Sequence, residues 1–486
     1  MTIESCPGGR VGEDGITNPS NIRVLVVGVG IGGLAAAIEC HRKGHSVILV
    51  DKIAQVDPLA GDGIGIGTNG ARIIAKWGGG RVHDQILSHR CDTRKIEILN
   101  RQGESFGQHE LKGYGRDHGY MLNRGQLVSI LFDYAGTLGI DKRLGSPVTE
   151  YRETEMGAAV VLEGGEVIEA DCVICSDGVH GAGRKFVTSL DPVSRESGWA
   201  MSRAYLRKED LKPHRDRDVR ILDGTDKQDR MMVWFDHGIQ VSMWTVKHGE
   251  ELVWIVTHKV SVDLSLLPPP TLGTKDARDT WTMEGSESMI EDTISQIHDW
   301  PSRNMIEPIL RSTPPKRLLN QKIITREPLD RWVSPHGRMI IIGDAAHPYP
   351  PISGQGGSQA IEDAAVVAIA LQLAGKDHVP LALRIAEKIR SVTSHYLMLQ
   401  GHHMLKSTGS HPRATAIQTE ASHLYELMFK PDWGVVAKNP SILAPPCPKW
   451  LFQHDSQAYV YAEFGKIAEA MADGREYVIA NTPPSA

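Results

Sequence analysis

The chain has 486 residues, of which 41% are hydrophobic and 23% are charged, and its formal net charge is -6 at pH 7. This length is enough for roughly two or three domains, and the composition is that of a globular protein. The negative charge argues against a nucleic-acid partner, and no apolar run approaches the roughly 20 residues that a membrane-spanning helix needs.

The N-terminus and the cysteines indicate a protein of a reducing compartment. Residues 1–20 form a polar stretch without the apolar core of a signal peptide. The six cysteines are scattered, which does not indicate a disulfide scaffold, so we expect a cytoplasmic location. Cys172 and Cys175 form a C-x-x-C, but they lie in a predicted strand, where this separation places them on opposite faces. We therefore predict two strand thiols and no metal site.

The first chemical signal is a glycine motif between two apolar runs. The run 21–27 leads into Gly28, Gly30 and Gly33, a helical stretch follows, and a second apolar run ends at Asp51. Strand, G-x-G-x-x-G, helix, strand and acid is the order of a dinucleotide-binding unit. Gly28 would make the tight turn, Gly30 would admit a pyrophosphate, and Gly33 would allow helix–sheet packing. Asp51 would bond a ribose, whereas a buried corner without a ligand is the alternative.

Two weaker signals follow. Residues 61–69 contain four glycines, including Gly63, so this backbone either passes close to something or forms a mobile loop. A helix is predicted to begin near Asn123, with an apolar face formed by its leucines and isoleucine. Arg124 in its first turn either reaches a cofactor or lies in solvent.

The middle of the chain predicts two kinds of sheet. Residues 145–170 alternate and turn at Gly164, which indicates a hairpin or meander. The run 172–176 is a buried strand that ends at Asp177 and Gly178, so an acid again follows a strand. From about residue 198, short strands that contain Trp234, Trp244 and Trp254 predict an antiparallel sheet. A surface loop is expected over 262–280 and a helix over 289–300.

The stretch 343–363 predicts a second cofactor-binding element. An apolar strand leads to Gly343 and Asp344, a proline bend includes Pro351, and a glycine cluster opens an apolar helix near residue 358. The glycines of this cluster are Gly354, Gly356 and Gly357. An acid at the end of a strand can bond sugar hydroxyls, and a glycine-lined helix N-terminus favours an electron-rich ligand edge. An ordinary strand–turn–helix corner is the alternative. Helices are then expected over 376–410 and 455–473, with a proline-rich connector at 439–448.

The three motifs together resemble the group A flavoprotein monooxygenases, of the para-hydroxybenzoate and salicylate hydroxylase type. The run from Gly61 to Asn69, the Arg124 helix and the run GDAAHP…PP…GQGG look most like the fungal salicylate-hydroxylase-like branch, which supplies tailoring enzymes of secondary metabolism. The resemblance covers roughly residues 21–375. It is specific for the fold and for FAD, and much less so for the substrate.

The resemblance implies an α/β fold, with a discontinuous Rossmann-like FAD domain, an inserted antiparallel-sheet substrate domain and a C-terminal helical region. The implied FAD domain comprises 21–195 and 321–375, the substrate domain 196–320 and the helical region 376–486. The glycine motif and Asp51 would hold the ADP half of FAD, and Arg124 and Asp177 would lie near its chain. Asp344 would bond the ribityl hydroxyls, and the helix end at residues 354–357 would face the isoalloxazine.

In such enzymes NAD(P)H is a transient co-substrate that reduces FAD, and O2 then forms a flavin C4a-hydroperoxide that hydroxylates an electron-rich ring. Three departures from the family pattern stand out. Asp51 replaces the usual glutamate and Gly181 replaces a serine. Arg203 matches a family arginine at the start of the substrate domain, but no tyrosine occurs between Tyr205 and Tyr349, where many relatives have one. The region without a tyrosine contains His237, so Arg203 and His237 are the candidate catalytic residues.

We predict an FAD-dependent monooxygenase that uses NAD(P)H and O2 to hydroxylate an aromatic or electron-rich small molecule. The missing tyrosine keeps epoxidation of an indole-like or alkenyl substrate open as an alternative. An NAD-dependent dehydrogenase and a non-catalytic flavin-binding scaffold are further alternatives. A flavin halogenase is not indicated, because the W-x-W-x-I-P signature is absent.

Overall fold

We describe the fold from a computed structural model. It describes residues 19–111, 113, 119–190, 195–211, 220–259, 287–326, 328–349, 351–403, 431–439 and 449–479. The loop expected over 262–280 lies outside these residues, as do 404–410 of an expected helix and all but the first residue of the expected connector.

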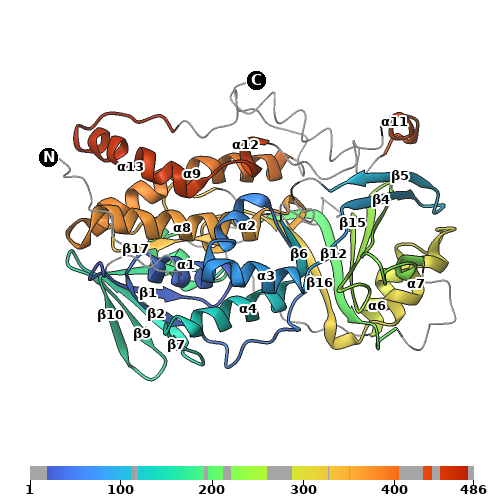
Figure 1. Ribbon diagram of the computed structural model, residues 1–486, viewed down its shortest axis with the longest axis horizontal. Helices are drawn as coiled ribbons and strands as arrows, with labels where there is room; N and C mark the ends of the chain where they lie inside the picture. Colours follow the sequence, from blue (N-terminus) through green and yellow to red (C-terminus); the bar gives the residue numbers. More distant parts are fainter. Residues whose placement is uncertain are drawn as a thin grey trace.

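A five-stranded parallel sheet collects strands from both ends of the chain. Its order is β17-β11-β1-β2-β7. The strands are β1 (Arg23–Val27), β2 (Ser46–Val50), β7 (Asp141–Arg143), β11 (Cys172–Cys175) and β17 (Met339–Ile341). The helices α1 (Ile31–Arg42) and α8 (Gly356–Ala374) pack against each other beside this sheet (Figure 1). Because β17 and α8 follow β11 by more than 150 residues, this Rossmann-like unit is discontinuous, as predicted.

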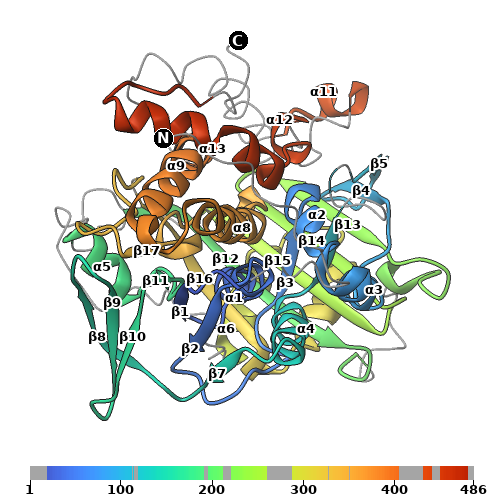
Figure 2. The same ribbon diagram turned by 60° about the vertical axis from the view of Figure 1, so that its left-hand side comes forward.

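A small three-stranded sheet, seen at the lower left of Figure 2, confirms the meander expected over 145–170. Its antiparallel strands are β8 (Val148–Glu153), β9 (Ala158–Leu162) and β10 (Val167–Ala170). The helix α5 (Ala182–Thr188) follows β11. Cys172 and Cys175 are buried free thiols in β11, as their place in a strand predicted.

The second large sheet has seven strands in the order β16-β12-β15-β14-β13-β4-β5. Its neighbours are antiparallel except for β4 and β13, which run parallel. The strands are β4 (Lys95–Asn100), β5 (Ser105–Glu110), β12 (Arg195–Arg207), β13 (Met231–Asp236), β14 (Ile239–Val246), β15 (Glu251–Lys259) and β16 (Leu318–Thr325). The range 196–320 expected for the inserted domain thus leaves out β4 and β5, which lie in the same sheet.

The two faces of the seven-stranded sheet have different neighbours. One face packs against α6 (Glu287–Ser295) and α7 (Arg303–Arg311), and its core contains Trp234 and Trp254. Trp244 lies in the core of the other face, together with Tyr205 and Val253. Because side chains alternate along a strand, Arg203 shares the face of Tyr205, whereas Ser202 points to α6 and accepts a hydrogen bond from Thr293.

A two-stranded ribbon connects the two large sheets. It pairs β3 (Gly63–Ile66) with β6 (Tyr120–Asn123). A Cβ on Gly63 would lie 2.0 Å from Trp244 Cζ2, and one on Gly357 of α8 would lie 2.7 Å from Ile66 Cδ1. The ribbon therefore touches β14 on one side and α8 on the other. The neighbouring helices are α2 (Thr68–Ile74), α3 (Arg81–Leu87) and α4 (Arg124–Thr137).

The C-terminal part is helical where the structure describes it. It contains α9 (Val379–His403), α11 (Trp433–Lys438), α12 (Lys449–Phe452) and α13 (Ser456–Ala472), and α13 packs on α8 and α9. Short 3-10 turns occur at Trp77–Gly80, Arg220–Leu222, Pro315–Arg317, Gly343–Ala345, Pro351–Ser353 and Lys376–His378. None of the described helices is by itself long and apolar enough to cross a membrane. The bent pair Gly356–Ala374 and Lys376–Ser394 meets that criterion by length and composition only.

Candidate cofactor and active site

The predicted cofactor residues line one edge of the parallel sheet. Gly28 follows β1, Asp51 follows β2, Asp177 lies two residues after β11, and Asp344 lies three residues after β17. Parallel strands present their carboxyl ends at the same edge, where ligands of such sheets bind. The strand order places these groups in the row Asp344, Asp177, Gly28, Asp51. With neighbouring strands roughly 4.8 Å apart, the row spans about 14 Å.

The glycine motif forms an open turn at the N-terminus of α1. Gly28 has a φ of 113°, and a Cβ there would lie 2.2 Å from the Ser176 carbonyl oxygen. A Cβ on Gly33 would lie 1.8 Å from the Gly28 oxygen, whereas one on Gly30 would meet no heavy atom within 4 Å. No side chain caps the start of α1. The first N–H groups of α1 therefore have no side-chain cap, and the space beside Gly30 allows a pyrophosphate to approach them.

Asp51 holds this turn in place. Its Oδ2 accepts a hydrogen bond from the Val29 amide at 2.5 Å, and its Oδ1 accepts one from the Ile53 amide at 2.9 Å. Each carboxylate oxygen has a further lone pair, so these contacts leave room for a ribose hydroxyl. The ribose contact itself stays a prediction.

Asp177 lies at the crossing point of the sheet and is turned toward α5. Its Oδ2 accepts hydrogen bonds from the Tyr151 hydroxyl at 2.8 Å and from the Gly183 amide at 2.9 Å, and burial raises its pKa. Its buried Oδ1 has no hydrogen-bond partner among the described residues. A Cβ on Gly181 would lie 2.0 Å from the Asp177 Cγ, so this side-chain position requires the glycine that replaces the family serine.

The turn after β17 brings Asp344 to the N-terminus of α8. Gly343 has a φ of 58°, and the position of a Cβ on Gly356 lies 3.9 Å from Asp344 Oδ1. Gly354 has a φ of 60° and donates its amide to the Pro351 oxygen at 3.1 Å. Pro351 is exposed. The acid and the helix end predicted from the motif therefore lie side by side.

A charged cluster of Arg124, Asp62 and Arg203 lies between this edge and the seven-stranded sheet. Asp62 Oδ2 lies 2.9 Å from Arg203 Nε, and the Asp62 carbonyl accepts the Arg124 amide at 2.7 Å. Burial raises the pKa of Asp62, while both arginines oppose that shift. Burial lowers the pKa of Arg124, against the charges of Asp62 and Asp344. Arg124 therefore interacts electrostatically with Asp62, Arg203 and Asp344.

Arg203 is fixed within this cluster. It is 2% exposed, and its Nη2 donates to Gln321 Oε1 at 2.9 Å. The arginine predicted from its position in the chain therefore lies buried on the sheet face that turns toward the cofactor edge, and it is ion-paired there. This ion pair therefore does not lie on the outer face of the sheet.

His237 lies apart from these residues. It is in the turn between β13 and β14, its side chain is 72% exposed, and its Nδ1 lies 3.9 Å from Asp236 Oδ1. Ser242, which the sheet register aligns with Arg203 through Ile255, is five residues further along, or about 16 Å of extended strand. An exposed turn at this distance does not suit a group that acts in a water-excluded site, so we drop His237 from the candidate catalytic residues.

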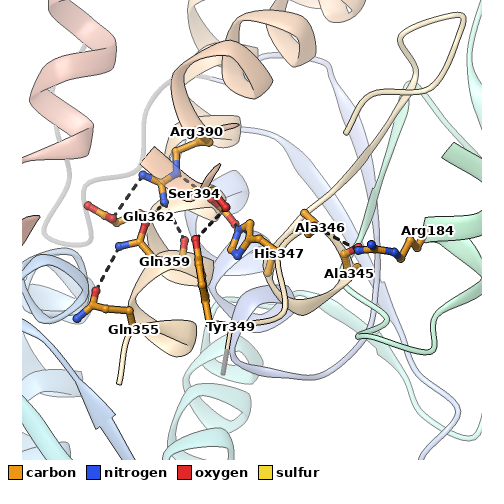
Figure 3. Close-up of polar contacts among 12 residues, drawn as sticks. Arg184, Ala345, Ala346, His347, Tyr349, Gln355, Gln359, Glu362, Arg390 and Ser394 are labelled. Atoms are coloured by element: carbon orange, nitrogen blue, oxygen red, sulfur yellow. Dashed lines mark hydrogen bonds and ion pairs between the residues drawn. The ribbon is translucent and has the colours of Figure 1, made fainter. Parts of the chain in front are cut away.

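Several site residues have no role in the sequence-based prediction. Asp62 lies inside the glycine-rich run, where the glycines predict a close backbone approach but no pattern marks the acid. A buried polar network around Arg390 contacts the turn that carries Asp344 through the Gly343 amide and His347, and Figure 3 shows its residues around Arg390 and His347. Its members are Asn69, His347, Gln355, Gln359, Glu362, Asp363 and Arg390. His347 and Asp363 belong to the run 343–363, but Arg390 has no motif around it.

The described residues fit a flavin dinucleotide. The unobstructed glycine turn suits a pyrophosphate, and acids stand at both ends of the row. The unpartnered Asp177 oxygen marks a buried acceptor near its middle. Gly28, Gly30, Gly33 and Asp51 would hold the adenosine half. Asp344 and the start of α8 would hold the flavin half.

Comparisons with known proteins agree with this geometry. Two models of FAD binding domains match residues 23–59 and 328–384. Asperlicin C monooxygenase of Petromyces alliaceus is 39% identical over 96% of this chain and 94% of its own. FAD-dependent monooxygenase fmqB of Aspergillus fumigatus is 41% identical over 87% of this chain and 95% of its own.

Solved structures show the same similarity. FqzB is 40% identical with a TM-score of 0.78, and covers 96% of this chain and 98% of its own. CtdE, crystallised with FAD and a substrate, is 33% identical with a TM-score of 0.79, and covers 93% of this chain and 100% of its own. The resemblance predicted from the motifs is confirmed, and the dehydrogenase and scaffold alternatives are not supported. This chain belongs to the FAD-dependent monooxygenases and binds FAD.

Proposed function

We propose that this monooxygenase hydroxylates an aromatic or otherwise electron-rich small molecule, with NAD(P)H as the reductant. The balance is substrate, O2, NAD(P)H and a proton giving hydroxylated substrate, NAD(P)⁺ and water. Bound FAD, once reduced, supplies the activation of O2. The relative named for asperlicin C and the CtdE complex with a substrate support a small organic substrate.

The observation that carries the proposal is the buried pair of Arg203 and Asp62. A guanidinium keeps its charge at any working pH and presents a rigid fork of donors. Asp62 and Gln321 hold it on the face of β12 that turns toward the cofactor edge. There it would donate to a phenolate, a carbonyl or an alkoxide of the substrate, and stabilise negative charge as oxygen is transferred.

Tyr205 does not replace the missing tyrosine. Although it shares the face of Arg203, burial and a hydrogen bond to Glu251 raise the pKa of its hydroxyl well above the ordinary value. A phenol held in this way does not take up or release a proton near neutral pH. Arg203 therefore carries the polar chemistry of this face in our proposal.

Oxygen-isotope labelling tests the proposal. Purified holoprotein is incubated with NADH or NADPH, ¹⁸O2 and a panel of phenols, indoles and fused heteroaromatic compounds. We expect substrate-dependent oxidation of NADH or NADPH and a product that contains one ¹⁸O atom. Oxidation of NADH or NADPH that yields only hydrogen peroxide with every compound would contradict the proposed hydroxylation.

Epoxidation is the second candidate. Hydroxylation of a phenol is helped by a residue that deprotonates it, and Tyr205 does not suit that role because its pKa is raised. Epoxidation of a carbon–carbon double bond needs no such residue. The cofactor stoichiometry is the same, but the oxygen adds across a carbon–carbon double bond. Trapping the labelled product with a thiol separates the two outcomes, since an epoxide opens and a phenol does not.

A further inference from the structure

One face of α9 is built against the segments around the Asp344 turn. Glu387, Arg390 and Ser394 are spaced by three and four residues, so they lie on the same side of the helix. Glu387 Oε1 accepts the amides of Trp332 at 2.5 Å and Val333 at 3.1 Å, which lie before β17. Ser394 accepts the Tyr349 hydroxyl at 2.8 Å, after the turn. Arg390 lies between these two contacts and reaches α8.

Arg390 is linked to the Gly343 turn through a single carboxylate. Its Nε donates to Asp363 Oδ1 at 2.8 Å. The other oxygen, Oδ2, accepts the Gly343 amide at 3.0 Å and bonds His347 Nε2 at 2.6 Å. Asp344 directly follows Gly343. The guanidinium therefore orients the carboxylate that anchors the turn on which Asp344 stands.

The same guanidinium is linked to the N-terminus of α8. Its Nη2 donates to Gln359 Oε1 at 2.5 Å, and Gln359 Nε2 donates to Gln355 Oε1 at 3.3 Å. Gln355 immediately precedes Gly356, the first residue of α8. Asn69 Nδ2 donates to the same Gln355 oxygen at 3.3 Å, which ties in α2. Figure 3 shows this chain from Arg390 through Gln359 to Gln355.

These links are shielded from water. Arg390, Asp363 and Glu362 are each 1% exposed, and Gln359 is fully buried. Charged hydrogen bonds in such surroundings fix geometry strongly, because breaking one leaves an unpaired buried charge. A single side chain of the C-terminal helical region thus joins the acid and the helix end that face the flavin half of FAD.

We propose that Arg390 is a positioning residue for bound FAD, which acts through Asp363 on the Asp344 turn and through Gln359 on the N-terminus of α8. The inference rests on FAD binding and not on the identity of the molecule that is oxygenated. A failure to find a hydroxylated product would therefore leave it standing.

The test compares Arg390→Met and Arg390→Lys with Arg384→Met, an exposed arginine of the same helix. FAD is removed from each full-length protein, and its dissociation constant is measured by quenching of flavin fluorescence. We expect Arg390→Met to raise that constant about tenfold or more, Arg390→Lys to raise it less, and Arg384→Met to leave it unchanged. The visible absorption bands of bound flavin should shift in Arg390→Met alone.

Two further measurements separate positioning from general destabilisation. If Arg390 only supports the fold, melting temperatures with and without FAD fall equally in Arg390→Met and the dissociation constant stays the same, which overturns the proposal. If it positions FAD, the gain in melting temperature on adding FAD shrinks. The double variant Arg390→Met/Asp363→Asn removes the charges of Arg390 and Asp363, and Arg390→Lys keeps a positive charge beside Glu362, so these two variants serve if Arg390→Met fails to fold. Where Arg390→Met and Asp363→Asn fold as single variants, the effect of the double variant on the FAD dissociation constant should be smaller than the product of the two single effects, because both residues act on one turn. A fully multiplicative result would contradict action through Asp363.

Discussion

Asp62 Oδ2 lies 2.9 Å from Arg203 Nε, and this buried ion pair joins the loop before β3 to the first long strand of the seven-stranded sheet. Arg124 adds a second positive charge beside Asp62, and its amide bonds the Asp62 carbonyl. The charge of Arg203 is thereby fixed in place relative to the cofactor edge. Removing Asp62 would leave both guanidinium groups without their shared carboxylate, whereas removing Arg203 would leave Asp62 with the charge of Arg124.

The first prediction takes this pairing into account. Arg203→Ala would remove the guanidinium that lies 2.9 Å from the buried Asp62 carboxylate and would destabilise the protein, which would obscure any catalytic effect. In Arg203→Met/Asp62→Asn both charges are removed, so we expect a folded protein whose turnover is about 10²–10³-fold lower. Flavin reduction by NAD(P)H without substrate should keep its rate, as measured by stopped-flow absorbance. Turnover close to that of the unmodified enzyme, with the same product, would remove Arg203 from the mechanism.

The second prediction concerns Gly63, which the glycine-rich run suggested as a cofactor residue. In the structure its bare backbone accommodates the Trp244 ring, since a Cβ would lie 2.0 Å from Cζ2. Gly63→Ala should therefore lower the free energy of unfolding by about 1–3 kcal/mol. Urea unfolding of the FAD-free protein measures this loss. The smaller aliphatic side chain in Gly63→Ala/Trp244→Leu should recover part of this loss, whereas a pure cofactor contact predicts a change in FAD affinity and no such recovery.

The elements of the fold that depend on residues close together in the sequence could be predicted. The βαβ unit around Gly28 and the strand–turn–helix around Asp344 follow from local apolar runs and glycines. The partners of β4 could not be predicted, because β4 pairs with β13 across more than 130 residues and no local pattern encodes that register. The faces of Trp234 and Trp244 were also undetermined, since both sit in similar short apolar strands.

The candidate site divides in the same way. The acids that follow strands can be predicted from their position in the sequence. Arg390 cannot, because it lies in an ordinary amphipathic helix and only the packing of α9 on α8 brings it to Asp363 and Gln359. His237 lies close to Trp234 in the sequence, but the sheet places it in an exposed turn.

The third prediction addresses Asp344. Asp344→Ala removes the acid beside the N-terminus of α8, which should bond the ribityl hydroxyls. Losing a charged hydrogen bond costs about 1.5–3 kcal/mol, or roughly a tenfold to hundredfold rise in the FAD dissociation constant. Isothermal titration of the FAD-free protein measures it. An unchanged constant would show that this acid does not contact the cofactor.

The fourth prediction distinguishes two roles of Asp51. Its oxygens accept the Val29 and Ile53 amides, so Asp51→Ala should both weaken FAD binding and loosen the glycine turn. Asp51→Asn keeps one acceptor oxygen, and we expect it to bind FAD with intermediate affinity. Hydrogen exchange of the turn amides, followed by mass spectrometry, reports the loosening. Faster exchange with unchanged FAD affinity would make Asp51 a residue of the turn alone.

The last prediction follows from the pKa of Asp363. Burial alone would raise this pKa, but His347 and Arg390 outweigh burial and lower it from 3.8 to about 2. A carboxyl whose pKa is lower in the folded state contributes stability above its unfolded pKa, and this contribution disappears as the pH falls toward 2. The full contribution is about 2 kcal/mol, of which about 1 kcal/mol should be lost between pH 5 and pH 3. Urea unfolding at both pH values should therefore show a stability difference between the unmodified protein and Asp363→Asn that narrows by this amount. Asp473→Asn, an exposed aspartate of the C-terminal part, is the control and should show no comparable narrowing. A difference that stays constant from pH 5 to pH 3 would mean that Arg390 and His347 do not hold the Asp363 proton affinity down, and that the carboxylate bonds the Gly343 amide for other reasons.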